Sequence, residues 1–281
     1  MKALIFFGIL FSLSSTYAAE ESRFHLLNMK CEPESASDLA ETSPQSPPLS
    51  VDDPGTPGCN KWEINFLMNG DITKNEKTWD LPLLDINYGI GDNLQITYEV
   101  PMVKNQTEDS NQTSVGSSKA GLKYMFFEDE ESKVQIAFYP QVEFATSKEN
   151  QDSNTSGSIT TLLILLSKKL SETPQGDLIL TTNLGYTKST NPNVVDTAFF
   201  AAGLGMPLYK KISIMGELAT EQALKKQDDV RDQLVKANIG VMSPITKNLF
   251  VYGSVGQSIF SSDEKTHTYV LAGVRVLASG F

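Results

Sequence analysis

Apolar and polar residues alternate along residues 79–103, and this alternation predicts two β-strands joined by a tight turn. The stretch reads WDLPLLDINYGIGDNLQITYEVPMV, with apolar residues at every second position on both sides of Gly89–Asp92. Because successive side chains of a strand point to opposite faces, each strand has one apolar and one polar face. The apolar face must therefore meet either a protein core or lipid.

The same period-two pattern recurs from residue 61 to residue 277, and it predicts twelve strands in all. Segment 133–144 shows the pattern most clearly. Segment 158–168 is apolar on both faces, so a short helix is an alternative there. Besides these two and the two strands of the opening hairpin, strands are expected at 61–69, 117–127, 177–187, 196–207, 211–220, 233–243, 248–257 and 267–277.

The connections between these strands alternate in length. Those after even-numbered strands are short, at 89–92, 128–132, 170–175, 208–210 and 244–247. Those after odd-numbered strands are mostly longer and polar, for example at 104–116, 145–157 and 221–232. Outer-membrane barrels combine short periplasmic turns, long extracellular loops and strands of about ten residues. The pattern predicts an all-β fold, a transmembrane antiparallel up-and-down β-barrel of about 12 strands, with a secreted β-sandwich as the alternative.

The first 18 residues have the organisation of a signal peptide. Lys2 precedes an apolar run from Ala3 to Leu13, and small residues follow the run, which is too short for a spanning helix. We expect a signal peptide at 1–18, an N-terminal segment at 19–60 and an outer-membrane β-barrel at 61–281. The expected location is the bacterial outer membrane, reached by export, with outer-membrane lipid and the barrel-assembly machinery as partners.

The segment 19–60 differs in composition from the rest of the chain. It is rich in Glu, Asp, Ser and Pro, and such a composition cannot bury enough apolar surface to order itself. Cys31 and Cys59 are the only cysteines, and export to an oxidising compartment makes them candidate disulfide partners. We interpret the segment as a tail closed by this disulfide. A periplasmic extension or a plug inside the barrel lumen is the alternative interpretation.

Charge and residue types exclude several classes of function. A formal net charge of −11 argues against nucleic acid, whose phosphates require Lys and Arg. Metal ligation and other cofactors are not expected, because the only histidines are His25 and His267. His267 is near Ser258, Ser261 and Ser262 in sequence, but no G-x-S-x-G motif accompanies these serines. We therefore expect that the protein is not an enzyme.

If the apolar parity faces lipid, the polar parity lines the lumen. The candidate lumen-lining residues are Glu63, Asn65, Asp85, Asn87, Gln95, Glu99, Lys119, Lys123, Gln135, Gln141, Glu143, Lys236 and Arg275. These residues form either the wall of a narrow polar pore or a hydrogen-bonded network that fills the barrel. Barrels of about 8 strands are filled and barrels of 16–18 strands leave a channel, so a strand count of twelve leaves both interpretations open.

The stretch Leu83-Leu84-Asp85-Ile86-Asn87-Tyr88-Gly89-Ile90-Gly91-Asp92-Asn93-Leu94-Gln95 resembles the outer-membrane family named for the MetA pathway of phenol degradation. Members of that family are commonly labelled transporters. Tyr88-Gly89-Ile90 and Val100-Pro101 match the family pattern, except that Ile90 stands where Leu is more usual. The resemblance covers about residues 61–281 and implies a barrel that takes up small organic molecules. It carries over no catalytic or ligand-binding residues.

These observations predict a narrow channel or transporter for small solutes, with organic or aromatic molecules as the class that the family resemblance implies. A structural or surface-contact barrel with a blocked lumen is the main alternative. A barrel enzyme and a secreted β-sandwich are weaker alternatives. The small solute is the only soluble partner expected.

Overall fold

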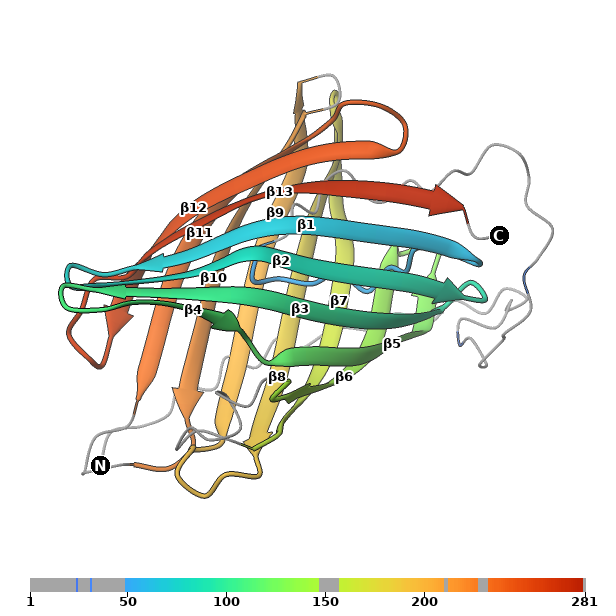
Figure 1. The fold of residues 1–281 in the computed structure, drawn as a ribbon. Coiled ribbons are helices and arrows are strands. Elements are labelled where there is room, and N and C mark those ends of the chain that lie inside the picture. The colour runs from blue at the N-terminus through green and yellow to red at the C-terminus, as the bar shows by residue number, and fades with distance from the viewer. Residues whose placement is uncertain are drawn as a thin grey trace, which may run out of the picture.

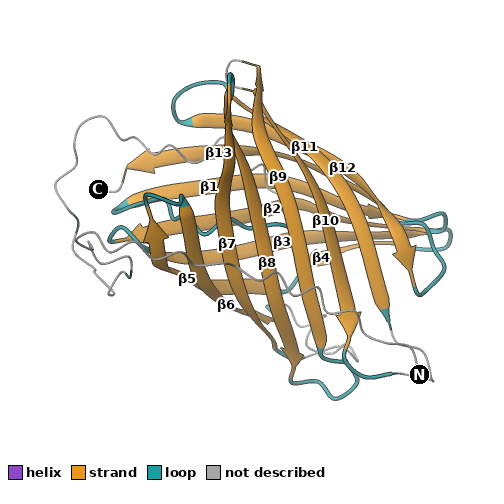
Figure 2. Cartoon of the chain, turned by 180° about the vertical axis from the view of Figure 1, so that it is seen from behind, coloured by secondary structure: helices purple, strands orange, loops and turns teal. Residues whose placement is uncertain are grey.

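The computed structural model describes residues 24, 31, 49–146, 157–209, 212–226 and 232–279. Its strands are β1 Lys61–Ile72, β2 Glu76–Ile90, β3 Leu94–Thr107, β4 Asn111–Val115, β5 Ser118–Asp129, β6 Val134–Phe144, β7 Ile159–Thr173, β8 Gly176–Ser189, β9 Thr197–Tyr209, β10 Ile212–Ala223, β11 Gln233–Pro244, β12 Leu249–Ser261 and β13 Thr268–Ser279 (Figure 2). The signal peptide expected at 1–18 lies outside the described residues. Within the described ranges, no helix is long and apolar enough to cross a membrane.

The strands form one antiparallel sheet that closes on itself (Figure 1). β1 pairs with β2 on one side and with β13 on the other. Pairing then runs from β13 back to β5, and the pairs β5–β3 and β3–β2 complete the ring. Twelve strands close the barrel and β4 is an additional strand, so the predicted fold is confirmed. Closure pairs both edges of every strand in the ring, which is what a strand needs in order to cross a bilayer.

The additional strand lies where the sequence predicts a polar loop, at 104–116. β3 continues to Thr107, and β4 folds back along it with pairs from Met102↔Val115 to Gln106↔Asn111. The loop prediction is therefore wrong for most of this stretch. Thr and Val have high strand propensity, and a polar hairpin above the membrane needs its ladder of hydrogen bonds but no apolar face.

The segment predicted at 158–168 lies in strand β7, so the helical alternative is wrong. Leu162 and Ile164 are exposed on the outer surface, whereas Leu163 and Leu165 are buried inside the barrel. The inner pair belongs to an apolar cluster formed by β5, β6 and β7. Both faces of this strand are apolar because one face meets lipid and the other meets this cluster.

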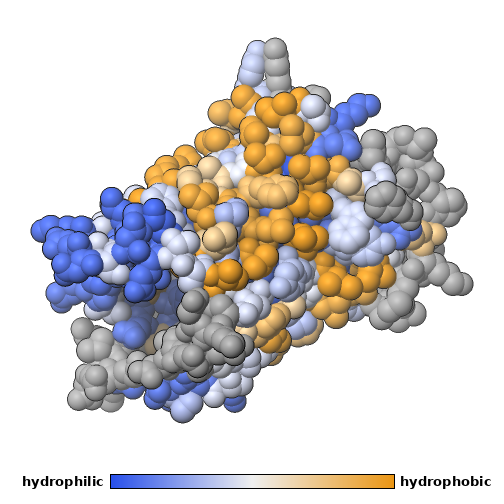
Figure 3. Space-filling model, viewed as in Figure 1, coloured by the Kyte–Doolittle hydropathy of each residue, from blue (hydrophilic) through white to orange (hydrophobic). Residues whose placement is uncertain are grey.

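Exposed apolar side chains form a broad band around the barrel. On β8 and β9, Leu184 and Phe200 are 62% and 47% exposed, while their neighbours Asn183 and Ala201 are buried. Figure 3 shows the band in the middle of one face, with hydrophilic residues gathered at the end where the β1–β2 and β3–β4 hairpins lie. An apolar band of this kind around a closed barrel is the surface that lipid covers.

The connections of the barrel are sorted by length between its two ends. Connections 91–93, 130–133, 174–175, 210–211 and 245–248 have two to four residues each and share the end where β1 starts and β13 stops. We call this the short-turn end, and by the rule for outer-membrane barrels it faces the periplasm. The opposite end has the longer connections, at 145–158, 190–196, 224–232 and 262–267. The three-residue connection 73–75 is the exception there.

Candidate functional site

The N-terminal segment runs inside the barrel before β1 begins. Residues 49–58, which we call the lumen segment, lie between the walls in the blue part of the ribbon (Figure 1). At the short-turn end, the Asn60 amide donates a hydrogen bond to the Gly89 carbonyl (3.1 Å). Thr56 Oγ1 donates to the Asp92 carbonyl (2.9 Å). From there the segment crosses the lumen toward the inner faces of β8, β9 and β10.

Glu217 on β10 holds the N-terminal part of the lumen segment. Its carboxylate accepts hydrogen bonds from the Ser50 amide (2.9 and 3.0 Å) and from the Val51 amide (3.1 Å). Asn238 Nδ2 on β11 donates to the same carboxylate (2.5 Å). Glu217 is only 4% exposed, and a buried carboxylate needs donors of this kind to offset the loss of water.

Two further wall side chains bind the backbone of the residues that follow. Asn183 Oδ1 accepts a hydrogen bond from the Asp52 amide, and Asn183 Nδ2 donates to the Asp52 carbonyl, both at 2.7 Å. Lys123 Nζ donates to the carbonyls of Asp53 (2.9 Å) and Gly55 (3.2 Å). Three strands, β10 with Glu217, β8 with Asn183 and β5 with Lys123, thus hold one extended piece of chain.

One side chain of the lumen segment is buried in an apolar niche. Val51 is 4% exposed and packs with Ala201, Met215 and Ala219 on the inner faces of β9 and β10. Leu49 packs against the same cluster. Burying a Val side chain contributes roughly 1.5–2 kcal/mol. The niche therefore adds an apolar contact to the polar ones.

The interpretation of segment 19–60 as a tail is wrong for residues 49–58. Pro54 and Pro57 do prevent regular secondary structure, as the composition suggests. The backbone groups of the segment instead find partners on the barrel wall, 68 to 167 residues away in sequence. Composition cannot reveal partners at such separations. The alternative interpretation, a plug in the lumen, matches this part of the chain.

Cys31 and Cys59 form a disulfide, with Cα atoms 5.5 Å apart and a sequence separation of 28. Cys59 lies just before β1, so the bridge holds Cys31 at the short-turn end as well. The lumen segment therefore belongs to a covalently closed loop, both ends of which lie at that end of the barrel. Further upstream in the sequence, the Phe24 ring packs against the Phe127 ring on β5, with 5.2 Å between the ring centres.

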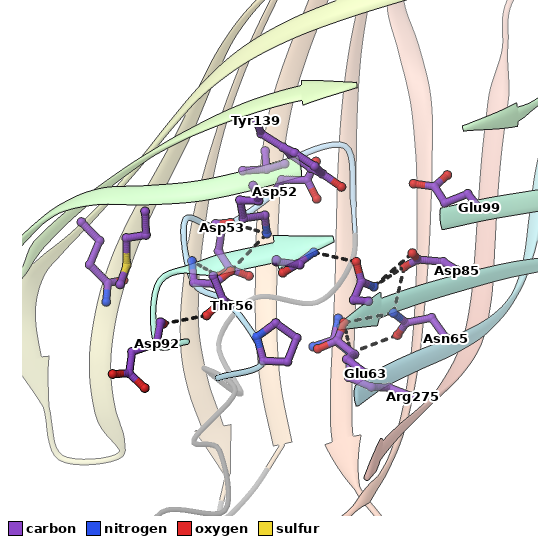
Figure 4. A pocket seen from close by; sticks show the side chains of 18 of the residues that line it. Asp52, Asp53, Thr56, Glu63, Asn65, Asp85, Asp92, Glu99, Tyr139 and Arg275 are labelled. Atoms are coloured by element: carbon purple, nitrogen blue, oxygen red, sulfur yellow. Dashed lines mark hydrogen bonds and ion pairs between the residues drawn. The ribbon is translucent and has the colours of Figure 1, made fainter. Parts of the chain in front are cut away.

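A cavity of about 410 Å³ remains between the lumen segment and the barrel wall (Figure 4). β1, β2 and β3 form much of this wall, and β5, β6, β8 and β13 contribute the rest. Its charged lining residues are the carboxylates of Asp52, Asp53, Glu63, Asp85, Asp92 and Glu99 and the cations of Lys123 and Arg275. Six carboxylates against two cations give a formal charge of −4 when all are ionised. The cavity is therefore polar and carries excess negative charge.

Asp85 is the centre of a network on the β1–β3 side of the cavity (Figure 4). Asn65 Nδ2 donates to its carboxylate at 2.9 Å, and Asn87 Nδ2 donates at 3.0 and 3.1 Å. Arg275 Nε lies 3.2 Å from the Glu63 carboxylate and donates to Asn65 Oδ1 at 3.1 Å. The carboxylates of Glu63 and Asp85 thus contact amides and one guanidinium on the three neighbouring strands β13, β1 and β2.

A second charged group lies further along the same wall. Lys119 Nζ on β5 pairs with the Glu99 carboxylate on β3 at 2.8 Å. Glu143 faces Lys119 across the β5–β6 ladder. Elsewhere inside the barrel, Lys236 Nζ lies 4.9 Å from the centre of the Tyr269 ring. The inner wall therefore combines ion pairs, amides and aromatic rings.

The structure brings most of the predicted lumen-lining residues to one cavity. Those that line it are Glu63, Asn65, Asp85, Asn87, Gln95, Glu99, Lys123, Gln135 and Arg275. Lys119, Gln141, Glu143 and Lys236 do not line it, although Gln141 is buried and Lys119 binds Glu99. Sequence reasoning missed the residues of the lumen segment and five lining residues of the barrel itself, which are Leu67, Asp92, Met125, Tyr139 and Ile179. The only sequence signal of the lumen segment is its position directly before the first strand.

His267 lies in the connection between β12 and β13, at the end opposite the short turns. Its Nδ1 is 2.9 and 3.1 Å from the two Asp71 oxygens, and its Nε2 is 3.2 Å from Asp263. Ser258 Oγ accepts a hydrogen bond from the His267 backbone amide instead (2.9 Å), and Ser261 Oγ donates to Asp263 (2.5 Å). Both ring nitrogens thus face carboxylates, and the ring ties the connection to the end of β1.

The ionisation of His267 and Asp263 follows from their contacts. Burial of the His267 ring lowers its pKa, but hydrogen bonds to Asp71 and Asp263 outweigh burial and raise the pKa above its usual value. Hydrogen bonding from Ser261 is the largest cause that lowers the pKa of Asp263 to about 2. These contacts therefore favour a protonated His267 ring beside the ionised carboxylates of Asp71 and Asp263.

The sequence matches no family model and no curated protein. Solved structures that resemble the fold include two outer-membrane proteins. An outer membrane channel from Pseudomonas putida F1 aligns with a TM-score of 0.65 and 9% identity, covering 82% of this chain and 100% of that chain. The NanC porin aligns with a TM-score of 0.54 and 8% identity, covering 76% and 98%. Identities this low show the fold alone, and that fold is a barrel of the outer-membrane type.

Proposed function

We propose that the protein is a channel of the bacterial outer membrane for small solutes, and that its lumen segment closes the channel. The observation that carries the proposal is a polar cavity inside a lipid-facing barrel, bounded by a segment that crosses the lumen. The channel from Pseudomonas putida F1 and the NanC porin, which share the fold, support a transport role. Export by residues 1–18 and insertion by the barrel-assembly machinery belong to this proposal.

The cavity lining favours a small polar organic solute. Carboxylates, amides and cations make up most of the lining, and an apolar molecule gains little by replacing water beside such groups. The resemblance to the family named for the MetA pathway of phenol degradation is compatible with a polar aromatic solute such as a phenol. A hydrocarbon without polar groups fits this lining less well.

The second candidate function is a structural barrel whose lumen stays blocked. The observation that favours it is the number of contacts that hold the lumen segment, from the Asn60–Gly89 hydrogen bond to the Glu217 carboxylate. The two candidates differ in one measurable property. A channel must conduct when the segment moves, whereas a structural barrel does not.

Single-channel recording in planar bilayers tests the proposal. Val51→Asp and Val51→Asn each place a polar group in the apolar niche, so both variants are expected to release the segment and to raise conductance at least five-fold over the wild type. Val51→Ala keeps the niche apolar and is the matched control, with conductance close to the wild type. Heat-modifiable gel mobility verifies that each barrel is folded. Folded but silent Val51→Asp and Val51→Asn variants would reject the channel in favour of the structural barrel.

A further inference from the structure

The barrel wall recognises the lumen segment through backbone groups. Glu217 binds two amides, Asn183 binds the amide and the carbonyl of one residue, and Lys123 binds two carbonyls. In each of these hydrogen bonds the partner from the segment is a main-chain atom. The wall therefore binds the backbone of an extended peptide. It contacts one side chain closely, that of Val51, in a small apolar niche.

The wall groups are also arranged by charge along the segment. The anionic Glu217 binds near its N-terminal part, at Ser50 and Val51, and the cationic Lys123 binds near its C-terminal part, at Asp53 and Gly55. A free peptide in the same direction would place its ammonium group toward Glu217 and its carboxylate toward Lys123. Opposite charges at these ends make such contacts stronger than neutral hydrogen bonds.

Release of the lumen segment removes the backbone partners of Glu217, Asn183 and Lys123, and Glu217 keeps the hydrogen bond from Asn238. Glu217 and Lys123 are 4% and 6% exposed, and Asn183 is 1% exposed. A buried charge or amide that loses its hydrogen-bond partners carries an unfavourable free energy. A ligand that offers amide donors and carbonyl acceptors in the same order would offset this cost, and the reciprocal pair of bonds made by Asn183 matches the N–H and the C=O of one residue.

We propose that Glu217, Asn183 and Lys123, together with the niche of Ala201 and Met215, form a binding site for short peptides, which the lumen segment occupies in the closed state. The inference rests on the proposed function, because a peptide can enter only when the segment leaves. It names short peptides with a small aliphatic side chain as the solute class of the channel. The chain's own residues 50–55 act as a built-in competitor.

The test uses the full-length Val51→Asp protein in detergent and isothermal titration calorimetry. The probe is the hexapeptide Ser-Val-Asp-Asp-Pro-Gly with free termini, which has the sequence of residues 50–55. We expect saturable binding. A peptide N-methylated at the amide nitrogens of its Val and its first Asp is expected to bind at least ten-fold more weakly, because it lacks the donor from Val to Glu217 and the donor from Asp to Asn183. A peptide with the two Asp residues replaced by Ala is expected to bind within about two-fold.

Protein variants complete the test. Glu217→Gln and Asn183→Leu, each in the Val51→Asp background, are expected to weaken binding at least ten-fold. Lys236→Gln is the matched control, because Lys236 is inside the barrel and packs over Tyr269 rather than on the segment. Equal binding of the N-methylated peptide, or no binding to a Val51→Asp protein that conducts, would overturn the inference and leave the channel proposal intact. A silent but peptide-binding protein would overturn the channel alone.

Discussion

Glu217 and Lys123 show how single side chains position the lumen segment. Both face the lumen, both are less than 10% exposed, and both bind backbone atoms of the same segment. A hydrogen bond to a charged group contributes about 1.5–3 kcal/mol, so each of these residues depends on the segment as much as the segment depends on it. The closed state is thus stabilised from both sides of the lumen.

His267 gives a prediction at the scale of one residue. Its folded-state pKa is raised, so its contacts with Asp71 and Asp263 stabilise the β12–β13 connection fully below pH 6.5. This stabilisation is lost as the pH rises through the raised pKa. Amide hydrogen exchange of residues 262–267, corrected for the intrinsic dependence on pH, is expected to be three- to ten-fold faster at pH 9 than at pH 6.

His267→Gln is the variant that checks the cause. Gln keeps a polar side chain but cannot become an imidazolium, so the corrected exchange rates at pH 6 and pH 9 are expected to agree within two-fold. Residues 91–93 at the short-turn end serve as an internal control in the same measurement. A wild-type connection whose corrected exchange does not change between these pH values contradicts the role assigned to His267.

Strands β8 and β9 show how one element divides its residues between lipid and lumen. Leu184 and Phe200 face outward while Asn183 and Ala201 face inward, and the two pairs are neighbours in the β8–β9 ladder. The strand period alone sets this division. In β7 both faces are apolar. There the strand period assigns residues to two faces, but it does not show which of the two apolar faces meets lipid.

The lipid face of β8 gives a prediction at the scale of the element. Leu184 is near the middle of its strand, and Leu208 on β9 is next to the strand end. Leu184→Arg is expected to lower the free energy of unfolding by about 2–4 kcal/mol, and Leu208→Arg by about 0–1 kcal/mol, because the cost of a cation depends on its depth in the bilayer. Urea unfolding in lipid vesicles measures both. Equal losses for the two variants would contradict the assignment of the band to lipid.

At the scale of the whole molecule, the cavity charge comes from distant parts of the chain. Asp52 and Asp53 belong to the lumen segment, Asp85 and Glu99 to β2 and β3, and Arg275 to β13. The barrel closes β13 onto β1 and thereby brings these residues to one space. When the lumen segment leaves, Asp52 and Asp53 leave with it, and the wall of the cavity keeps four carboxylates (Glu63, Asp85, Asp92 and Glu99) against the two cations Lys123 and Arg275. This remaining excess makes the open lumen favour cations over anions.

Ion selectivity is the prediction for the whole molecule. The Val51→Asn channel, which adds no charge, is expected to pass K⁺ at least three-fold more readily than Cl⁻ in a KCl gradient. Asp85→Asn in this background is expected to reduce the permeability ratio about two-fold, because it removes one carboxylate from the cavity wall. Asp177→Asn is the matched control, since Asp177 pairs with Lys169 outside the cavity. An anion-selective open channel would contradict the charge assigned to the lumen.

Much of the barrel could be predicted from the sequence because strand parity is a local property. The twelve strands of the ring, the short turns and the inward parity of Glu63, Asp85 and Arg275 follow from alternation and turn residues along the chain. β4 was not predicted, because a polar hairpin above the membrane has no apolar face to mark it. For residues 49–58 the sequence left a tail and a lumen plug as alternatives and favoured the tail, because the contacts that hold these residues in the lumen involve backbone atoms, which no residue pattern marks.

The sequence by itself determined the number of strands in the closed barrel and which face of most strands carries apolar residues. Both depend on the two-residue period of the strand and on turn lengths, which are visible in any short window of the chain. Only the tertiary structure decided that the segment before β1 crosses the lumen and that Glu217, Asn183 and Lys123 hold it. Backbone groups look alike in every sequence, so their partners become known only when closure of the barrel places those three side chains around one segment.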